Sequence, residues 1–198
     1  MANKFGAWTP LEPSALAVVL AAVQEPWWLA GGWALDAFLG RVTRAHEDTD
    51  ALILRRDHVE VRQTLAAWDA HAADPPGTLR PWPVGEELPP NVHDVWLRRS
   101  PAQDWAFQLM IDDTDVDNWI FRRNPRIRRT VASLSAGFWT GCQTLAPEVQ
   151  LLYKSTGLRP KDQLDFEVVL PALNARRREW LRTTLGVASP GHAWLDAL

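Results

Sequence analysis

The sequence predicts an α+β fold in which a sheet is combined with helices and the last third of the chain is helical. Two apolar stretches indicate the sheet: residues 27–30, which run into a pair of glycines, and residues 51–54, which are apolar throughout. An apolar run without alternation is typical of a strand that is covered on both faces. The last third instead contains prolines that suit the first turn of a helix, at Pro147 and Pro160.

The first part of the chain is predicted to hold two helices and two strands. Pro13 suits the start of the first helix because its missing N–H would have no partner there. Pro26 ends that pattern, and Gly40 suits the C-terminal cap of the second helix. The expected elements are a helix over 14–24, a strand over 27–30, a helix over 33–39 and a strand over 51–54.

The middle of the chain is predicted to contain one helix and a β-hairpin. Asp57 is a good N-cap for a helix from 58 to about 70. The many prolines between 75 and 90 cannot lie in a central ladder, so we expect a loop there that holds at most one edge strand. Residues 92–98 and 105–111 alternate as the two strands of a hairpin, and the acidic residues 112–117 are expected to form a solvated turn. Three helices then begin at Pro147, Pro160 and about Leu173.

Composition narrows the class of protein. The chain has 198 residues, enough for one or at most two domains, and no apolar run long enough to span a membrane. A net charge of −3 gives no electrostatic footprint for nucleic acid. The single cysteine, Cys142, excludes an internal disulfide and suits the cytoplasm, and its apolar surroundings predict a buried thiol with no chemical role. Both a monomer and a homodimer are compatible with these features.

Two carboxylates and two glycines form the candidate site. Asp48 and Asp50 alternate along the expected strand, so they project from the same face. A divalent cation is the simplest way to hold both ionised, and Mg²⁺ is usually bound by one or two carboxylates together with substrate phosphates. Gly31 and Gly32 would let the backbone approach a phosphate with N–H groups free to point at it. Without these glycines, an exposed strand end with incidental acids would be the default interpretation.

The same residues carry a resemblance to a known family. Gly-Gly-Trp-Ala-Leu-Asp over 31–36, followed by the pattern Arg-x-x-Arg-x-His-Glu-Asp-Thr-Asp over 41–50, resembles the polymerase-beta-type nucleotidyltransferase superfamily. Within it, the chain is similar to the small aminoglycoside and lincosamide adenylyltransferases. The resemblance is clear over 27–56 and fainter to about 171.

The resemblance implies a fold, a cofactor and a reaction. The fold would be a nucleotidyltransferase-like mixed β-sheet flanked by helices, with a catalytic domain over 1–145 and a helical segment over 146–198 that packs on it or stands apart. The co-substrate would be Mg²⁺-bound ATP, a nucleoside triphosphate, and AMP would pass to the hydroxyl of a small-molecule acceptor. Lys154 resembles the helix lysine that approaches the phosphates in this family, although an ordinary surface lysine fits the sequence as well. Arg44 is expected to reach the triphosphate, because a guanidinium suits bidentate phosphate contacts; the alternative is a solvated turn that balances nearby acids.

The chain departs from the family at the third carboxylate. Reading residues 105–111 against the family pattern places the expected acid on or near Gln108, and a glutamine cannot act as a base. Asp94 interrupts an otherwise apolar strand and could cross to the same face, and it is the preferred candidate, although it could also pair with an arginine at the sheet edge. Asp112 shares the face of Gln108 by parity and is the second candidate.

The sequence leaves the acceptor and the activity open. A polycationic aminocyclitol would need an acidic cleft, which Glu86, Glu87 and the acids over 112–117 could provide; a neutral hydroxyl compound of the lincosamide type is the alternative. Gln108 also motivates a different class of function, a catalytically inactive nucleotidyltransferase-like module that acts in binding or as an antitoxin. Transfer of AMP to a protein side chain is a third possibility that uses the same site.

Overall fold

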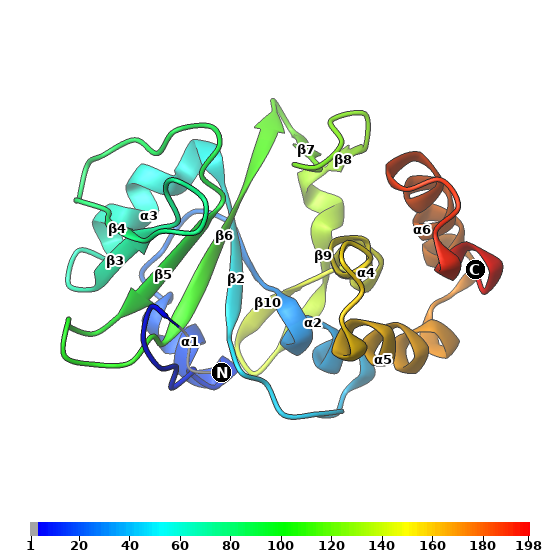
Figure 1. The fold of residues 1–198 in the computed structure, drawn as a ribbon, viewed down its shortest axis with the longest axis horizontal. Coiled ribbons are helices and arrows are strands. Elements are labelled where there is room, and N and C mark those ends of the chain that lie inside the picture. The colour runs from blue at the N-terminus through cyan, green and yellow to red at the C-terminus, as the bar shows by residue number, and fades with distance from the viewer. Residues whose placement is uncertain (1–3) are drawn as a thin grey trace.

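A ten-stranded mixed sheet runs through the middle of the protein (Figure 1). The computed structural model describes residues 4–198. The main path of the sheet has the order β4-β3-β5-β6-β2-β1-β10-β9, and β7 and β8 extend it from β6. The pairs β2–β6 and β1–β10 are parallel and the other pairs are antiparallel. The strands are β1 (Trp27–Leu29), β2 (Asp50–Leu54), β3 (Asp69–Ala72), β4 (Arg80–Pro81), β5 (Asp94–Arg98), β6 (Phe107–Asp115), β7 (Asn118–Ile120), β8 (Arg128–Thr130), β9 (Ser135–Trp139) and β10 (Cys142–Leu145).

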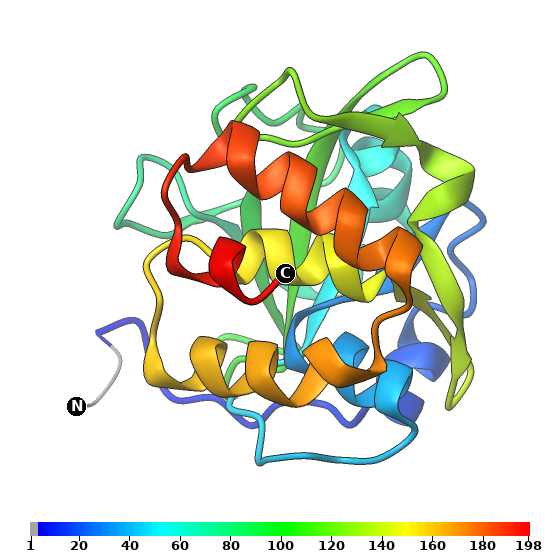
Figure 2. The ribbon, with the colours of Figure 1, turned by 90° about the vertical axis from the view of Figure 1, so that its right-hand side faces the viewer.

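Helices cover both faces of the sheet. The α-helices are α1 (Pro13–Val19), α2 (Gly31–Leu39), α3 (His58–Thr64), α4 (Pro147–Lys154), α5 (Pro160–Val169) and α6 (Ala175–Ala188). Helices α1 and α3 lie on one side, and α2, α4, α5 and α6 lie on the other (Figure 1). Figure 2 shows α4, α5 and α6 in front of the strands that they cover. Every helix within residues 4–198 is too short or too polar to cross a bilayer.

Successive side chains of β2 point to opposite faces of the sheet and pack into different parts of the hydrophobic core. Ala51 and Ile53 pack into the cluster that includes α1 and α3, and Leu52 and Leu54 pack into the cluster on the opposite face. All four side chains are buried. The predicted strand covered on both faces is therefore confirmed.

The C-terminal helices share the core of the sheet. The apolar cluster around Leu52 also contains Leu151 of α4, Phe166 of α5 and Leu181 of α6, all buried. Residues from both 1–145 and 146–198 thus contribute to one hydrophobic core, and burying a large apolar side chain in such a core is worth roughly 1.5–3 kcal/mol. The helices that begin at Pro147 and Pro160 are those the sequence predicts.

The helix expected over 14–24 is shorter than predicted and ends at Val19. Two further predicted boundaries are wrong for one shared physical reason. The helix expected over 58–70 ends at Thr64, and residues 69–72 form β3 instead, because pairing with β5 buries Ala70 and Ala72 on one face. The expected turn over 112–117 is mostly strand: β6 continues to Asp115 and pairs with β7. In both places, pairing with a distant segment overrides the local sequence preference.

Strands β9 and β10 are absent from the sequence prediction. They form an antiparallel pair at the edge of the sheet, next to β1. Cys142 lies in β10, free and buried, as the sequence predicts.

Candidate active site

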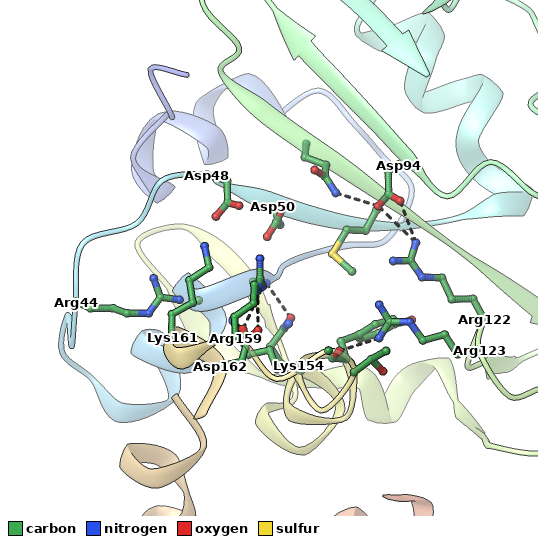
Figure 3. A pocket seen from close by; sticks show the side chains of 18 residues that line it. Arg44, Asp48, Asp50, Asp94, Arg122, Arg123, Lys154, Arg159, Lys161 and Asp162 are labelled. Atoms are coloured by element: carbon green, nitrogen blue, oxygen red, sulfur yellow. Dashed lines mark hydrogen bonds and ion pairs between the residues drawn. The ribbon is translucent and has the colours of Figure 1, made fainter. Parts of the chain in front are cut away.

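A cleft of about 470 Å³ opens on the face of the sheet that α4 and α5 cover. It lies where the chain leaves β1 for α2 and where β2 begins, and helix α4 faces these strands (Figure 3). The lining combines acidic, basic and glycine residues from segments far apart in the chain: Gly31, Gly32, Arg44, Asp48, Asp50, Asp94, Gln108, Met110, Arg122, Arg123, Gln150, Tyr153, Lys154, Thr156, Gly157, Arg159, Lys161 and Asp162.

The carboxylates of Asp48 and Asp50 point into this cleft from one side (Figure 3). Asp50 is the first residue of β2, and Asp48 lies in the loop before it. Neither carboxylate accepts a hydrogen bond or joins an ion pair with any residue of the described range 4–198. Burial, followed by the negative charge of Asp48, raises the pKa of Asp50 to about 7.

These two carboxylates fit a divalent cation. Two partly buried acids that repel each other and lack a partner are stabilised by positive charge between them. Hard carboxylate oxygens suit Mg²⁺, which completes its coordination with water and substrate phosphates and needs no further protein ligand. Within residues 4–198, no group of three or more His, Cys, Asp or Glu side chains could hold a metal ion. A cation at this pair would therefore depend on phosphate oxygens from its substrate.

The Gly31-Gly32 bend presses against the acidic loop. A Cβ atom on Gly31 would lie less than 3.0 Å from Oδ2 of Asp50. One on Gly32 would lie 2.5 Å from the His46 ring and 2.6 Å from Nη2 of Arg44. Gly31 also has a positive φ of 68°, which disfavours residues with a side chain. The prediction that both N–H groups are free is wrong for Gly31, whose N–H donates to Oε1 of Gln150 at 2.8 Å. The glycines are required because the backbone, Asp50 and Arg44 meet without room for a side chain.

Gly31→Ala is expected to displace Asp50 and to destabilise the protein. The added Cβ occupies the position of the Asp50 carboxylate, and the positive φ adds backbone strain of about 1 kcal/mol or more. We expect a fall in Tm of several degrees and the loss of Mg²⁺-dependent nucleotide binding, measured by thermal unfolding and titration calorimetry. Gly40→Ala is the matched control, because Gly40 has a φ of 67° but nothing within 4 Å of its Cβ. It should lose stability and keep binding; equal binding loss in both variants would contradict the steric argument.

Basic residues form the wall opposite the acidic pair. Lys154 is 7% exposed and lies 3.1 Å from Asp162 and 2.8 Å from Asp165. Asp165 also accepts two hydrogen bonds from Arg44, which raise the pKa of that guanidinium. Arg44 and Lys154 are thus brought together at the cleft as predicted, and the prediction that they meet phosphate stays a prediction.

Two further cations in this wall come from the start of α5. Arg159 pairs with Asp162 at 2.7 Å, and Lys161 pairs with the exposed Glu47 at 3.1 Å. Sequence reasoning missed Arg159, whose only signal is its position directly before the proline that opens α5. Figure 3 shows Arg44, Arg159 and Lys161 on the same side of the cleft, facing Asp48 and Asp50.

Asp36, also missed by sequence reasoning, holds the acidic loop in place. Its buried carboxylate meets Nε2 of His46 at 2.6 Å and accepts a hydrogen bond from the backbone N–H of Thr43 at 3.1 Å. The His46 ring packs on Trp33, with the ring centroids 4.2 Å apart. The last residue of the Gly-Gly-Trp-Ala-Leu-Asp motif therefore fixes the loop that carries Asp48, and His46 acts in support of that loop.

The structure brings Asp94 to the cleft beside Gln108. Asp94 faces Met110 across the β5–β6 pair, and Gln108 faces Asp50 across the β2–β6 pair, so these side chains share one face. Nε2 of Gln108 donates to Oδ1 of Asp94 at 2.9 Å, and Nη1 of Arg122 lies 3.4 Å from the same oxygen. Within residues 4–198 no group of three acids that includes Asp94 could hold a metal ion, and the role of Asp94 as a base stays a prediction.

Asp112 does not reach the cleft. It lies on the predicted face of β6 but is 0% exposed, because Tyr153 of α4 covers it. Its Oδ2 accepts hydrogen bonds from the Tyr153 hydroxyl and from Nε1 of Trp119. Burial raises the pKa of Asp112. Asp112 thus lies on the predicted face of the sheet. The prediction that it acts as a base is wrong, because no substrate can contact it.

The acids expected to hold a polycationic acceptor are also placed elsewhere. Glu86 pairs with Arg80 at 2.7 Å, Asp113 pairs with Arg55, and Asp115 pairs with Arg128 at 2.7 Å. None of these acids, nor Glu87, lines the cleft in the described range. The expectation of an acidic acceptor surface built from these loops is therefore wrong.

Comparison with known proteins matches the N-terminal part of the chain. The family model described as aminoglycoside-2''-adenylyltransferase matches residues 14–73. Two curated relatives, 2''-aminoglycoside nucleotidyltransferases from Escherichia coli and Klebsiella pneumoniae, are each 60% identical over 35 residues. These matches cover 16% of this chain and 20% of each relative, so the similarity spans about a fifth of the relatives' length.

Comparison with solved structures covers most of the chain. The crystal structure of ANT(2'')-Ia in complex with adenylyl-2''-tobramycin superposes with a TM-score of 0.52 at 17% identity, over 86% of this chain and 92% of that one. The lincomycin-bound lincosamide adenylyltransferase LnuA superposes with a TM-score of 0.54 at 16% identity, over 81% and 96%. The nucleotidyltransferase-like mixed sheet flanked by helices is thereby confirmed, as is the resemblance to the aminoglycoside and lincosamide adenylyltransferases.

Proposed function

We propose that this protein is an Mg²⁺-dependent nucleotidyltransferase that moves AMP from ATP to a hydroxyl group of a small molecule. The observation that carries the proposal is the arrangement of Asp48 and Asp50. Their carboxylates have no partner within residues 4–198 and face a wall of cations that includes Arg44 and Lys154. The acidic side chains would bind a cation, and the basic side chains opposite them would bind phosphates. This arrangement suits a metal-bound triphosphate.

The basic wall is suited to hold the phosphates of ATP. Lys154 and Arg44 are fixed by Asp165, so their positive charges are oriented before substrate binds. Arg159 and Lys161 add charge from the start of α5. Cationic side chains placed in advance around a phosphate stabilise the negative charge that develops during transfer, and this electrostatic contribution is usually the largest in such reactions.

Asp94 is positioned to take the proton of the acceptor hydroxyl. The amide of Gln108 and the guanidinium of Arg122 hold its carboxylate at the edge of the cleft. A positioned base of this kind contributes roughly 10²–10⁴-fold to the rate. A magnesium ion held by Asp48 and Asp50 would neutralise charge on the phosphates. At the Gly31-Gly32 bend the backbone lies directly against Asp50 and Arg44, where an added side chain would not fit.

The names of the similar proteins supply the first acceptors to test. Incubation of the protein with ATP, Mg²⁺ and a panel of hydroxyl compounds that includes aminoglycosides, lincosamides and sugars is expected to yield an AMP adduct of at least one of them, detected by mass spectrometry together with released pyrophosphate. Asp48→Asn should give no adduct because one of the two candidate metal ligands loses its charge. Glu47→Gln is the matched control, since Glu47 points into solvent and should leave the adduct unchanged. A protein that neither binds ATP in the presence of Mg²⁺ nor releases pyrophosphate would refute the proposal.

A second candidate function rests on Gln108. The residue opposite Asp50 in the parallel β2–β6 pair is an amide, and within residues 4–198 no group of three acids could hold a metal ion. A catalytically inactive nucleotidyltransferase-like module, acting in binding or as an antitoxin, would retain ATP binding without transfer. Mg²⁺-dependent ATP binding with no product from any acceptor, small molecule or protein, would favour this alternative.

A further inference from the structure

The end of the cleft beyond Asp94 is positively charged. Arg122 and Arg123, which follow β7, line the cleft and also a neighbouring hollow of about 370 Å³. Asp94 is the only acid among the described residues that line this hollow. Figure 3 shows the two arginines entering the cleft on the side opposite Arg44 and Lys161. This end is therefore separate from the wall assigned to the triphosphate, and it is the side from which an acceptor would approach Asp94.

The two guanidinium groups are fixed before any ligand binds. Their Cζ atoms lie 5.5 and 5.6 Å from the centre of the Tyr153 ring. Nη1 of Arg123 donates to the Tyr153 carbonyl oxygen at 2.7 Å, and the Tyr153 hydroxyl is bonded to the buried Asp112. Because these side chains are already ordered, binding an anion here would cost little rotamer entropy.

The charge of this pair is only partly compensated. Within residues 4–198, Arg122 has one ion pair, with Asp94 at 3.4 Å, and Arg123 has none. Burial, and then the adjacent charge of Arg122, lowers the pKa of Arg123. Two neighbouring guanidinium groups with a surplus of positive charge match a carboxylate or phosphate, which a planar guanidinium can bind through two parallel hydrogen bonds.

The same charges disfavour a polycationic acceptor. An aminocyclitol would bring several ammonium groups to a surface with two fixed cations and a single acid. Three nearby acids, Asp113, Glu86 and Asp115, pair with Arg55, Arg80 and Arg128 and do not line this end. An anion at Arg122 and Arg123 would instead relieve their mutual repulsion.

On the basis of the proposed function, we propose that Arg122 and Arg123 bind an oxyanion of the acceptor, and that the acceptor is therefore an anionic hydroxyl compound. In the reaction, the acceptor hydroxyl oxygen forms a bond to the α-phosphorus of ATP, and the bond from that phosphorus to the bridging α–β oxygen breaks. Pyrophosphate leaves with the electron pair of that bond, and the hydroxyl proton passes to Asp94. The oxyanion, a carboxylate or a phosphate, is not altered.

Calorimetric titration with matched sugars tests the subsite directly. The protein is saturated with Mg²⁺ and α,β-methylene-ATP, so that the triphosphate wall is occupied and the analogue cannot donate AMP. Glucuronate and glucose 6-phosphate are then compared with neutral methyl glucoside and with cationic kanamycin at low ionic strength, where electrostatic binding is strongest. We expect both anions to bind more tightly than the neutral sugar and kanamycin, and the tighter of the two identifies the oxyanion.

Variants of the two arginines and of a nearby one complete the test. Arg123→Met is expected to weaken anion binding about tenfold or more, as the loss of a charge-assisted hydrogen bond implies. Arg122→Lys should weaken it less, because the charge remains while the bidentate geometry is lost. The control is Arg126→Met, an exposed position in the same segment that lines neither cavity. Tighter binding of kanamycin than of either anion, or anion binding that is absent or indifferent to Arg123→Met, overturns the proposal.

The outcomes separate this inference from the proposed function. AMP transfer from ATP to kanamycin, with none to the anionic sugars, would support nucleotidyl transfer and overturn the anionic acceptor. Anion binding that depends on Arg123, in a protein that does not bind ATP with Mg²⁺, would support the subsite and refute the enzyme. Transfer to an anionic sugar that Arg123→Met weakens, while a neutral acceptor is unaffected, supports both.

Discussion

Asp50→Asn is expected to abolish Mg²⁺-dependent transfer while making the metal-free protein more stable at pH 8. Activity is lost because an amide is a poor ligand for Mg²⁺ compared with a carboxylate. We expect turnover to fall by about 10³-fold or more, since the charge at the developing phosphate is no longer neutralised. Pyrophosphate release and calorimetric titration of ATP with Mg²⁺ measure this loss.

The stability gain follows from the raised pKa of Asp50. Burial and the charge of Asp48 raise this pKa from 3.8 to about 7, so the folded protein binds a proton more readily than the unfolded chain. The penalty of ionising Asp50 in the fold is absent below pH 3.8, grows as the pH rises toward 7 and is complete above it. A shift of this size corresponds to at most about 4 kcal/mol at roughly 1.4 kcal/mol per pH unit, and water in the cleft reduces it. A gain of about 1–3 kcal/mol is therefore expected for the variant at pH 8.

Thermal unfolding in EDTA, at pH 4 and at pH 8, measures the sign of this effect. The Tm of Asp50→Asn should exceed that of the wild type by about 2–4 °C per kcal/mol at pH 8, and the two should agree at pH 4. Glu47→Gln is the control, because a hydrogen bond from Lys161 lowers the pKa of Glu47 and its removal should give no gain. A variant that is less stable than the wild type at pH 8 would show that Asp50 has a stabilising partner in the metal-free protein.

The sequence predicts those site residues that lie in one short segment of the chain. Gly31, Gly32, Asp48 and Asp50 lie within twenty residues, and strand parity together with the family resemblance predicts their common location. The alternation of side chains along a strand does not show which helix covers each face of the sheet. Alternation alone therefore makes Asp112 a candidate base, although Tyr153 buries it. To predict that Asp112 is covered, one must know how α4 packs on β6, and no local sequence pattern gives that information.

The basic residues of the cleft illustrate the same limit. Arg159 comes from the segment before α5, and Arg122 and Arg123 come from the segment after β7, so their meeting depends on tertiary packing. The strand over 69–72 was missed for a related reason, because its pairing with β5 overrides a helix-like sequence. Fold class and motif were predictable, whereas the partners of each charge were not.

Asp94→Asn is expected to lower the rate of transfer roughly 10²–10⁴-fold and to leave binding of ATP with Mg²⁺ unchanged. An asparagine has the same size and can still accept the hydrogen bond from Gln108, but it cannot take the acceptor proton. Single-turnover measurement of AMP transfer, together with titration of ATP, separates these two effects.

Two control variants decide whether Asp94 acts as this base or only supports the fold. Gln108→Leu should lower the rate less, because Gln108 only positions the carboxylate. Asp112→Asn should leave the rate unchanged, since an amide oxygen can still accept from Trp119 and Tyr153 in a place that substrate does not reach. Full activity of Asp94→Asn would show that Asp94 is not the base, and that the acceptor proton leaves by another route or the acceptor arrives deprotonated. An acceptor with a hydroxyl of low pKa tests this, because it needs no base and its transfer should be equally fast in the wild type and in Asp94→Asn.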